Sequence, residues 1–349
     1  MTAGLIWALA PVASKLGLID HPGGRKAHQS ATPLAGGPAI FIVVYLLAVL
    51  TLPDSRFLEA LGIGGLIMLV TGMIDDRSHL SAGVRIFIQI AACLAMMIWS
   101  HWYLTDFGRL MWDGVLQLHW LAWPVTIFAA LGVINSFNMI DGMDGLAGAI
   151  FLVAASGMAL FAGLAGDIVV FGLLLIFVAA VIGFMALNAR HPWNPKARIF
   201  LGDAGSLFLG FVLAWCAIRL GSGEGRAFMP ITAVWLVAVP LLDTSTLMWR
   251  RWRSGQSAFD ADRYHLHHAF LRAGYSVGGA WLRIVVLSLF LASVGVLLEL
   301  GGVPDYVSFY AFMVVAFTYY FYMKHCWRVQ RLLGHDFIYQ DFMVEEVYE

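Results

Sequence analysis

Long apolar runs, separated by shorter polar stretches, fill the chain from residue 3 to residue 324. A helix that spans a membrane needs about 20 apolar residues, with a range of about 17–25. On this basis we predict eleven spanning helices, at approximately 3–18, 38–53, 57–74, 84–104, 120–136, 143–164, 167–187, 204–221, 229–249, 281–300 and 304–324. The expected fold class is therefore all-α, a polytopic integral membrane protein with about 11 transmembrane helices.

Composition supports the same class. Hydrophobic residues make up 60% of the 349 positions and charged residues only 12%, whereas a soluble domain carries about 25% charged residues. No repeat, linker or low-complexity segment interrupts the pattern, so we expect a single domain over residues 1–349 and no nucleic-acid partner. Cys93 and Cys216 fall inside predicted spans, so no disulfide framework is indicated.

The Lys and Arg residues are distributed unequally between the two faces of the membrane that the eleven predicted spans define. Only four of the 21 Lys and Arg residues fall on one face, namely Arg56, Arg109, Arg219 and Arg226. Loops rich in Lys and Arg stay in the cytoplasm. We therefore expect an external, periplasmic N-terminus and a cytoplasmic C-terminus.

Five unusually polar stretches fall on this cytoplasmic face, at 20–37, 75–83, 135–145, 188–206 and 250–278. We expect them to converge as active-site loops of one transmembrane domain. Charged substrates from the cytosol would reach them there.

The stretch 135–145 lies between two apolar runs and is the most unusual of the five. Asn135, Asn138, Asp141 and Asp144 recur at every third position, so a helical turn would gather them within about half of its circumference. A carboxylate at bilayer depth costs roughly 2.5–3.5 kcal/mol. Such residues are therefore expected to serve a function.

Three further carboxylates lie at predicted span ends. Asp75 and Asp76 are adjacent and repel each other unless a cation or proton lies between them. Asp203 begins the eighth predicted span. Mg²⁺ takes one or two carboxylates together with substrate phosphates, which favours a magnesium or phosphate site. The alternatives are a solvated loop entry for the pair and a helix N-cap for Asp203.

Basic and imidazole side chains occupy two other loops. Lys26 and His28 are placed to contact a phosphate or diphosphate, or they supply topological charge only. His265, His267 and His268 are suited to contact a sugar nucleotide. A solvated cluster and a structural zinc site are the alternatives. Zinc is disfavoured because no cysteine lies nearby and His267 points away from the face that the other two share on a helix.

These motifs resemble those of the polyprenyl-phosphate N-acetylhexosamine-1-phosphate transferases, which include the phospho-MurNAc-pentapeptide transferase. The matching motifs are Arg-Lys-x-His at 25–28, Asp-Asp at 75–76, Asn-x-x-Asn-x-x-Asp-Gly-x-Asp-Gly-Leu at 135–146 and Ile-Phe-Leu-Gly-Asp-Ala-Gly-Ser at 199–206. Asp-Arg-x-His-Leu-His-His at 262–268 is similar to the WecA-type branch, which makes undecaprenyl-pyrophosphoryl-GlcNAc. That branch usually has Ile at the position of Leu266.

The resemblance implies Mg²⁺-dependent transfer, with Mn²⁺ as a substitute, of GlcNAc-1-phosphate from UDP-GlcNAc to undecaprenyl phosphate, with release of UMP. It implies a bacterial inner-membrane enzyme that initiates cell-surface polysaccharide synthesis, and it leaves a homodimer open. The implied catalytic residues are Asp75, Asp76, Asp141, Asp144, Asp203 and His265. The implied substrate-binding residues are Lys26, His28, Asn135, Asn138, Asn188, Arg198, Arg263, His265, His267 and His268, and the implied metal ligands are Asp76, Asn138 and Asp203.

Three other interpretations remain. In the first, the donor is another UDP-N-acetylhexosamine. In the second, the chain is a secondary transporter, and in the third it is a UbiA-like prenyltransferase. A transporter would place its acids at the midplane in broken, paired helices, whereas these acids lie at predicted helix ends. A UbiA-like enzyme favours Asn/Asp-x-x-x-Asp motifs, and the spacing from Asn138 to Asp144 is tighter.

Overall fold

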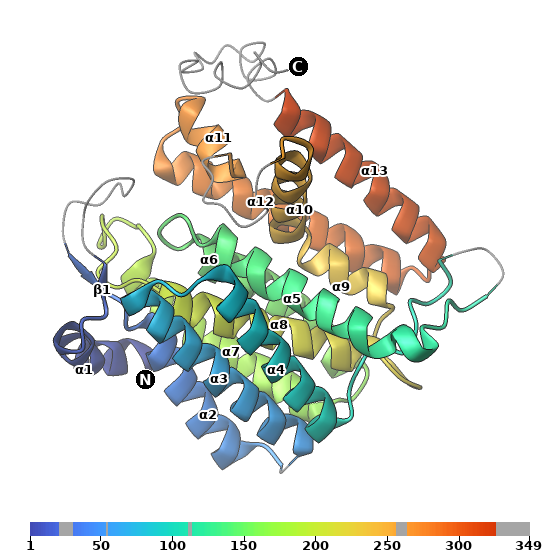
Figure 1. Ribbon diagram of the computed structural model, residues 1–349, viewed down its shortest axis with the longest axis horizontal. Helices are drawn as coiled ribbons and strands as arrows, with labels where there is room; N and C mark the ends of the chain where they lie inside the picture. The colour runs from blue at the N-terminus through green and yellow to red at the C-terminus, as the bar shows by residue number, and fades with distance from the viewer. Residues whose placement is uncertain (21–30, 54, 111–113, 256–263, 326–349) are drawn as a thin grey trace.

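The computed structural model describes residues 1–20, 31–53, 55–110, 114–255 and 264–325, and these residues are almost entirely helical (Figure 1). The helices are α1 (Thr2–Lys15), α2 (Gly36–Thr51), α3 (Arg56–Ser78), α4 (Ala82–Ser100), η1 (His119–Leu121), α5 (Ala122–Ile140), α6 (Leu146–Leu164), α7 (Ile168–Asn188), α8 (Gly202–Gly221), α9 (Pro230–Leu236), α10 (Ala238–Arg253), α11 (Leu266–Arg272), α12 (Val277–Leu300) and α13 (Asp305–Lys324). Two short strands, β1 (Ile19–Asp20) and β2 (Thr32–Pro33), pair antiparallel.

Within the described ranges, eight helices are long and apolar enough to cross a membrane, and the bent pair α9–α10 makes a ninth. Two N-terminal helices are shorter, α1 with 14 residues and α2 with 16. This is the architecture of a polytopic membrane protein. The predicted count of eleven spans and the predicted orientation stay predictions.

The span predicted at 229–249 is not one straight helix. It breaks at Val237 into α9 and α10, and the two halves are bent by 85°. Proline lacks an N–H donor and its ring clashes with the carbonyl four residues earlier. Pro240 in α10 stands four residues after Leu236, where α9 ends. The bend therefore has a local cause in the sequence.

Helix α8 lies at the centre of the bundle (Figure 1), and in its most apolar stretch 89% of the residues are buried. Its most extensive contacts are with α3 and α5. A side chain at Gly72 of α3 would overlap the backbone of Ala204. A Cβ at Gly37 of α2 would lie 2.5 Å from the backbone nitrogen of Gly205. Glycines thus let helix backbones touch around the start of α8.

A partly buried ion pair holds the opposite end of the bundle. Arg226 donates two hydrogen bonds of 2.8 Å to the carboxylate of Asp106, which also accepts from the Gly108 amide at 2.9 Å. Burial alone would raise the pKa of the Asp106 carboxyl, but the hydrogen bonds it accepts, above all those from Arg226, outweigh burial and lower it.

Replacing Asp106 by asparagine should lower the free energy of unfolding by about 1–3 kcal/mol at neutral pH, because Arg226, which is partly exposed, loses its charged partner. Since folding lowers this pKa, the stabilisation is fully present above the unfolded value of about 3.9 and is lost as the pH falls through the folded value. Thermal unfolding in detergent at pH 7 and below pH 4 measures the effect. A stability difference that stays constant down to low pH would contradict it.

Candidate active site

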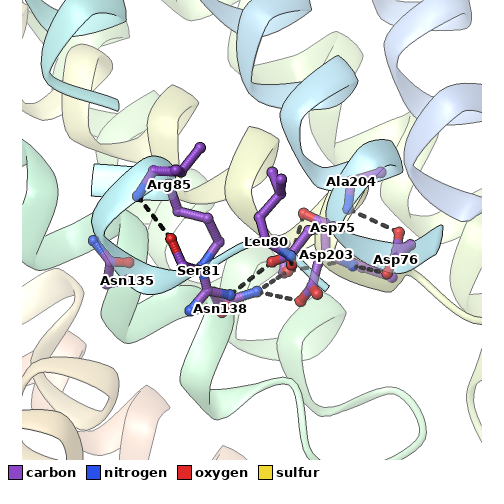
Figure 2. A network of polar contacts seen from close by, with 12 residues as sticks. Asp75, Asp76, Leu80, Ser81, Arg85, Asn135, Asn138, Asp203 and Ala204 are labelled. Atoms are coloured by element: carbon purple, nitrogen blue, oxygen red, sulfur yellow. Dashed lines mark hydrogen bonds and ion pairs between the residues drawn. The ribbon is translucent and has the colours of Figure 1, made fainter. Parts of the chain in front are cut away.

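Asp76 joins the end of α3 to the start of α8. Its Oδ1 accepts from the backbone N–H of Asp203 at 2.9 Å and its Oδ2 from that of Ala204 at 3.2 Å (Figure 2). The first N–H groups of a helix have no partner inside the helix, and Asp76 supplies partners from α3. A side chain at Gly202, where φ is +73°, would meet Asp76 Oδ2 at 2.6 Å. Glycine is therefore required at this turn.

Asp203 lies in the first turn of α8, and Leu201 occupies the N-cap position. The N-cap interpretation of Asp203 is therefore wrong, because an N-cap at 203 requires a helix that begins at residue 204, and α8 begins two residues earlier. The Asp203 side chain is free to serve another role.

Asn138 of α5 donates from Nδ2 to Asp203 Oδ1 at 2.7 Å and to Ser206 Oγ at 2.9 Å. The Ser206 hydroxyl donates in turn to the Gly202 carbonyl at 3.0 Å, which fixes the orientation of the Asn138 amide.

Asp75 is buried beside this pair (Figure 2). It accepts from the Leu80 backbone N–H at 2.7 Å and forms an ion pair with Arg85 Nη1 at 2.7 Å. In the sequence, Arg85 of α4 is one of the basic residues of the predicted cytoplasmic face, and nothing in the linear pattern links it to Asp75. The structure adds Arg85 to the site.

Asp141 and Asp144 follow α5 in the turn that ends at Gly145. Burial, together with the negative charges of Asp203, Asp76 and Asp144, raises the pKa of the Asp141 carboxyl to about 8. Among the described residues, no group donates a hydrogen bond to this carboxylate. Asp144 instead accepts from Arg190 Nε at 2.6 Å. The Asp141 carboxyl oxygens therefore lie beside the other acids without a hydrogen-bond partner in the described part of the chain, and they are available to bind a cation.

Asn135 does not join the carboxylates. Its Nδ2 donates to Gln89 Oε1 of α4 at 2.8 Å, and Gln89 returns a hydrogen bond of 3.3 Å. Three residues rotate a helix by about 300°, so Asn135 faces α4 while Asn138 faces α8. Helix α5 ends at Ile140, so of the four polar residues only Asn135 and Asn138 lie on a helical turn, and the role of Asn135 in substrate binding stays a prediction.

Asn188 connects two of the active-site loops. Its Oδ1 accepts from the Gly145 N–H at 2.8 Å and its Nδ2 donates to the Ile199 carbonyl at 2.7 Å. These contacts orient backbone on both sides of the site. Arg198 is exposed, and its Nη2 donates to the Trp193 carbonyl at 3.4 Å. Lys26, His28 and Arg263 lie outside the described residues.

His267 packs against Gly142 in the Asp141–Gly145 turn, and the other two histidines pack against His267. His265 precedes α11, and its ring stacks on that of His267 with centroids 5.6 Å apart. The His268 ring centroid lies 4.2 Å from that of His267. Burial, together with the charges of His268 and His265, holds the pKa of His267 well below its usual value. His267 Nδ1 is buried and has no hydrogen-bond partner within the described part of the chain.

Gly142 to alanine should displace His267 without unfolding the protein. A Cβ at Gly142 would overlap the His267 ring, with Nε2 at 2.5 Å. Misplacement of a site group by about 1 Å can cost about 10²-fold in rate. We expect the catalytic rate of the purified variant to fall by about this factor, while its melting temperature stays unchanged. Gly83 to alanine is the control, because no atom lies within 4 Å of a Cβ there. Wild-type activity of the Gly142 variant would refute this role of the contact.

The carboxylates suit a hard divalent cation. The available ligand atoms are carboxylate and amide oxygens, which suit Mg²⁺ and Mn²⁺, and the Asp141 carboxyl accepts no hydrogen bond from the described residues. In the described ranges, no three His, Cys, Asp or Glu side chains are already arranged around a common ion position. An ion here would complete its shell with substrate oxygens and water, as Mg²⁺ usually does.

Comparisons with known proteins identify the family of the chain. Residues 58–221 match the model of glycosyl transferase family 4. The chain is 34% identical over 326 residues to the undecaprenyl-phosphate α-N-acetylglucosaminyl 1-phosphate transferase of Yersinia pestis, covering 92% of this chain and 88% of the relative. The protein of the same name from Haemophilus influenzae is 33% identical over 323 residues, covering 93% and 91%. The chain belongs to glycosyl transferase family 4, as a member of the polyprenyl-phosphate N-acetylhexosamine-1-phosphate transferases.

Proposed function

We propose that this protein transfers GlcNAc-1-phosphate from UDP-GlcNAc to undecaprenyl phosphate, giving undecaprenyl-pyrophosphoryl-GlcNAc and UMP. The observation that carries the proposal is the meeting of Asp75, Asp76, Asn138 and Asp203 from α3, α5 and α8. The names of the relatives support the choice of donor and acceptor. The product would initiate synthesis of a cell-surface polysaccharide.

The proposed step is a displacement at phosphorus. An oxygen of the lipid phosphate attacks the β-phosphorus of UDP-GlcNAc, the bond from that phosphorus to the bridging oxygen breaks, and UMP leaves with the electron pair. Asp75, which pairs with Arg85, would take a proton from the lipid phosphate or would lie beside the magnesium ion. Such transfers depend mainly on positioning and on neutralisation of charge.

Asp203, with Asp76 and Asn138, would hold Mg²⁺, which supplies positive charge to the diphosphate oxygens. Asp141 and Asp144 would border the nucleotide pocket, with Asn188 holding the turn beside them. His265, His267 and His268 would face the sugar nucleotide. The polyprenyl tail would stay in lipid between the helices.

The predicted positive-inside orientation puts this site on the cytoplasmic face of the bacterial inner membrane, where UDP sugars are available. Addition of a reporter enzyme at position 224, in the connection after α8, tests the orientation. A periplasmic reporter signal agrees with it.

An isotope-exchange assay tests the reaction. Purified protein is incubated with radiolabelled UMP, UDP-GlcNAc, undecaprenyl phosphate and Mg²⁺, and label in UDP-GlcNAc is counted. Exchange that requires both the lipid and Mg²⁺ is the expected result, and chelation with EDTA should remove it. Parallel tubes with other UDP-N-acetylhexosamines identify the donor. No exchange with any donor would reject the proposed function.

A further inference from the structure

Asp243 is a buried carboxylate to which no role in the reaction has been given. It lies in α10, is 1% exposed, and accepts three hydrogen bonds from other elements. The donors are His265 Nδ1 at 2.8 Å, the Leu266 backbone N–H at 2.9 Å and the Tyr319 hydroxyl of α13 at 2.9 Å. A single side chain therefore connects α10, α11 and α13.

The contacts of Asp243 determine the state of His265. An ionised carboxylate can only accept hydrogen bonds, so His265 Nδ1 must carry a proton. The hydrogen bond at one ring nitrogen sets the role of the other, which leaves Nε2 for a ligand. Leu266 is the first residue of α11, so the same carboxylate also satisfies an N–H at the start of that helix.

The effect of Asp243 reaches the carboxylate site through stacked rings. His265 packs on His267 with an interplanar angle of 11°. His267 in turn packs on Gly142, which follows Asp141. A change in the position of His265 or of the start of α11 is therefore transmitted to the turn that carries Asp141.

We propose that Asp243, assisted by Tyr319, is a positioning residue for the transfer reaction. Asp243 orients His265 and holds α11 in place, so that the histidines face the sugar nucleotide. This inference rests on the proposed function, since the ligand it serves is the UDP sugar. Asp243 acts through His265 and touches neither substrate. Its role resembles that of a carboxylate that holds a histidine in one tautomer.

Asp243→Asn tests the inference, because asparagine keeps the shape and keeps an oxygen for Leu266 and Tyr319. Its NH₂ group would face His265 Nδ1 and impose the other tautomer. We expect kcat to fall by about 10- to 100-fold, as for other partners that orient a functional histidine, with the KM for undecaprenyl phosphate unchanged. Tyr319→Phe should have a smaller effect. Tyr310→Phe on the same helix, at a side chain that is 50% exposed, is the matched control.

A double-mutant cycle separates positioning from general stability. If Asp243 acts through His265, Asp243→Asn should cost little further kcat in a His265→Ala background. Fold losses that multiply in the double variant would overturn the proposal, and so would wild-type kcat in Asp243→Asn. Melting temperatures of all variants show whether folding contributes.

Hydrogen–deuterium exchange gives a readout independent of activity. Amides of residues 266–272 should lose protection in Asp243→Ala and keep it in Asp243→Asn, because only the alanine variant removes the acceptor of the Leu266 N–H. Unchanged protection in Asp243→Ala would overturn the proposed anchoring of α11. If the wild-type protein uses no UDP sugar, the proposed function fails, and the exchange pattern still decides whether Asp243 positions α11.

Discussion

Replacing Asp203 by asparagine should reduce transfer by about 10³-fold, the upper range for removal of one electrostatic group from an active site. The substitution removes the charge and little else. The backbone N–H of residue 203 still donates to Asp76, and an amide oxygen can still accept from Asn138. Initial rates of UMP release from purified protein measure the loss, and equal melting temperatures show that the bundle is intact.

Asp167 provides the matched control. It is also a partly buried carboxylate near a helix start, but it pairs with Arg219 at the other end of the bundle. Asp167→Asn should therefore leave the transfer rate unchanged. Full activity of Asp203→Asn in the same assay would remove Asp203 from the proposed mechanism.

Gly72→Ala should have the second large effect, on folding and on activity together. The new methyl group would overlap the backbone of Ala204 and Asp203, and backbone cannot rotate away as a side chain can. We expect a loss of stability of about 3 kcal/mol, at the upper end for overpacking. A shift of α3 against α8 would also separate Asp76 from its amide partners, and a displacement of about 1 Å can cost about 10²-fold in rate.

Gly132 of α5 is the control for Gly72. No atom lies within 4 Å of a Cβ at this position, and alanine in a helix is favoured over glycine by roughly 0.5–1 kcal/mol. Gly132→Ala should therefore be neutral or stabilising. Thermal unfolding and the transfer rate compare the two variants. Equal behaviour of both would show that the α3–α8 contact tolerates a side chain.

The helical class of the fold could be predicted because long apolar runs carry their own signal. A break of the helix inside such a run is harder to predict, because the sequence signal for it is weaker. Pro240 lies inside an apolar run, and the sequence does not say whether proline kinks a helix there or ends it. Helix α11 was not predicted, because its seven residues sit in a polar loop and are held by Asp243, 23 residues before Leu266.

The residue types of the site could also be predicted, but their partners could not. Asp76 finds its donors 127 and 128 residues later in the chain. Asn135 and Asn138 look equivalent in the sequence, yet one pairs with Gln89 and the other with Asp203. Which neighbour each meets depends on how α5 is rotated between α4 and α8. That rotation is set by packing, and local spacing does not record it.

Ribosomes deliver α8 to the membrane after α2, α3, α5 and α6, the helices that enclose it. The walls of the bundle are therefore synthesised before its centre. Until α8 arrives, Asp76 lacks these two amide partners, and Gly37 of α2 and Gly72 of α3 lack the helix backbone against which they pack. Assembly of the catalytic centre thus coincides with one late event of biogenesis, the entry of a single helix into a space prepared for it.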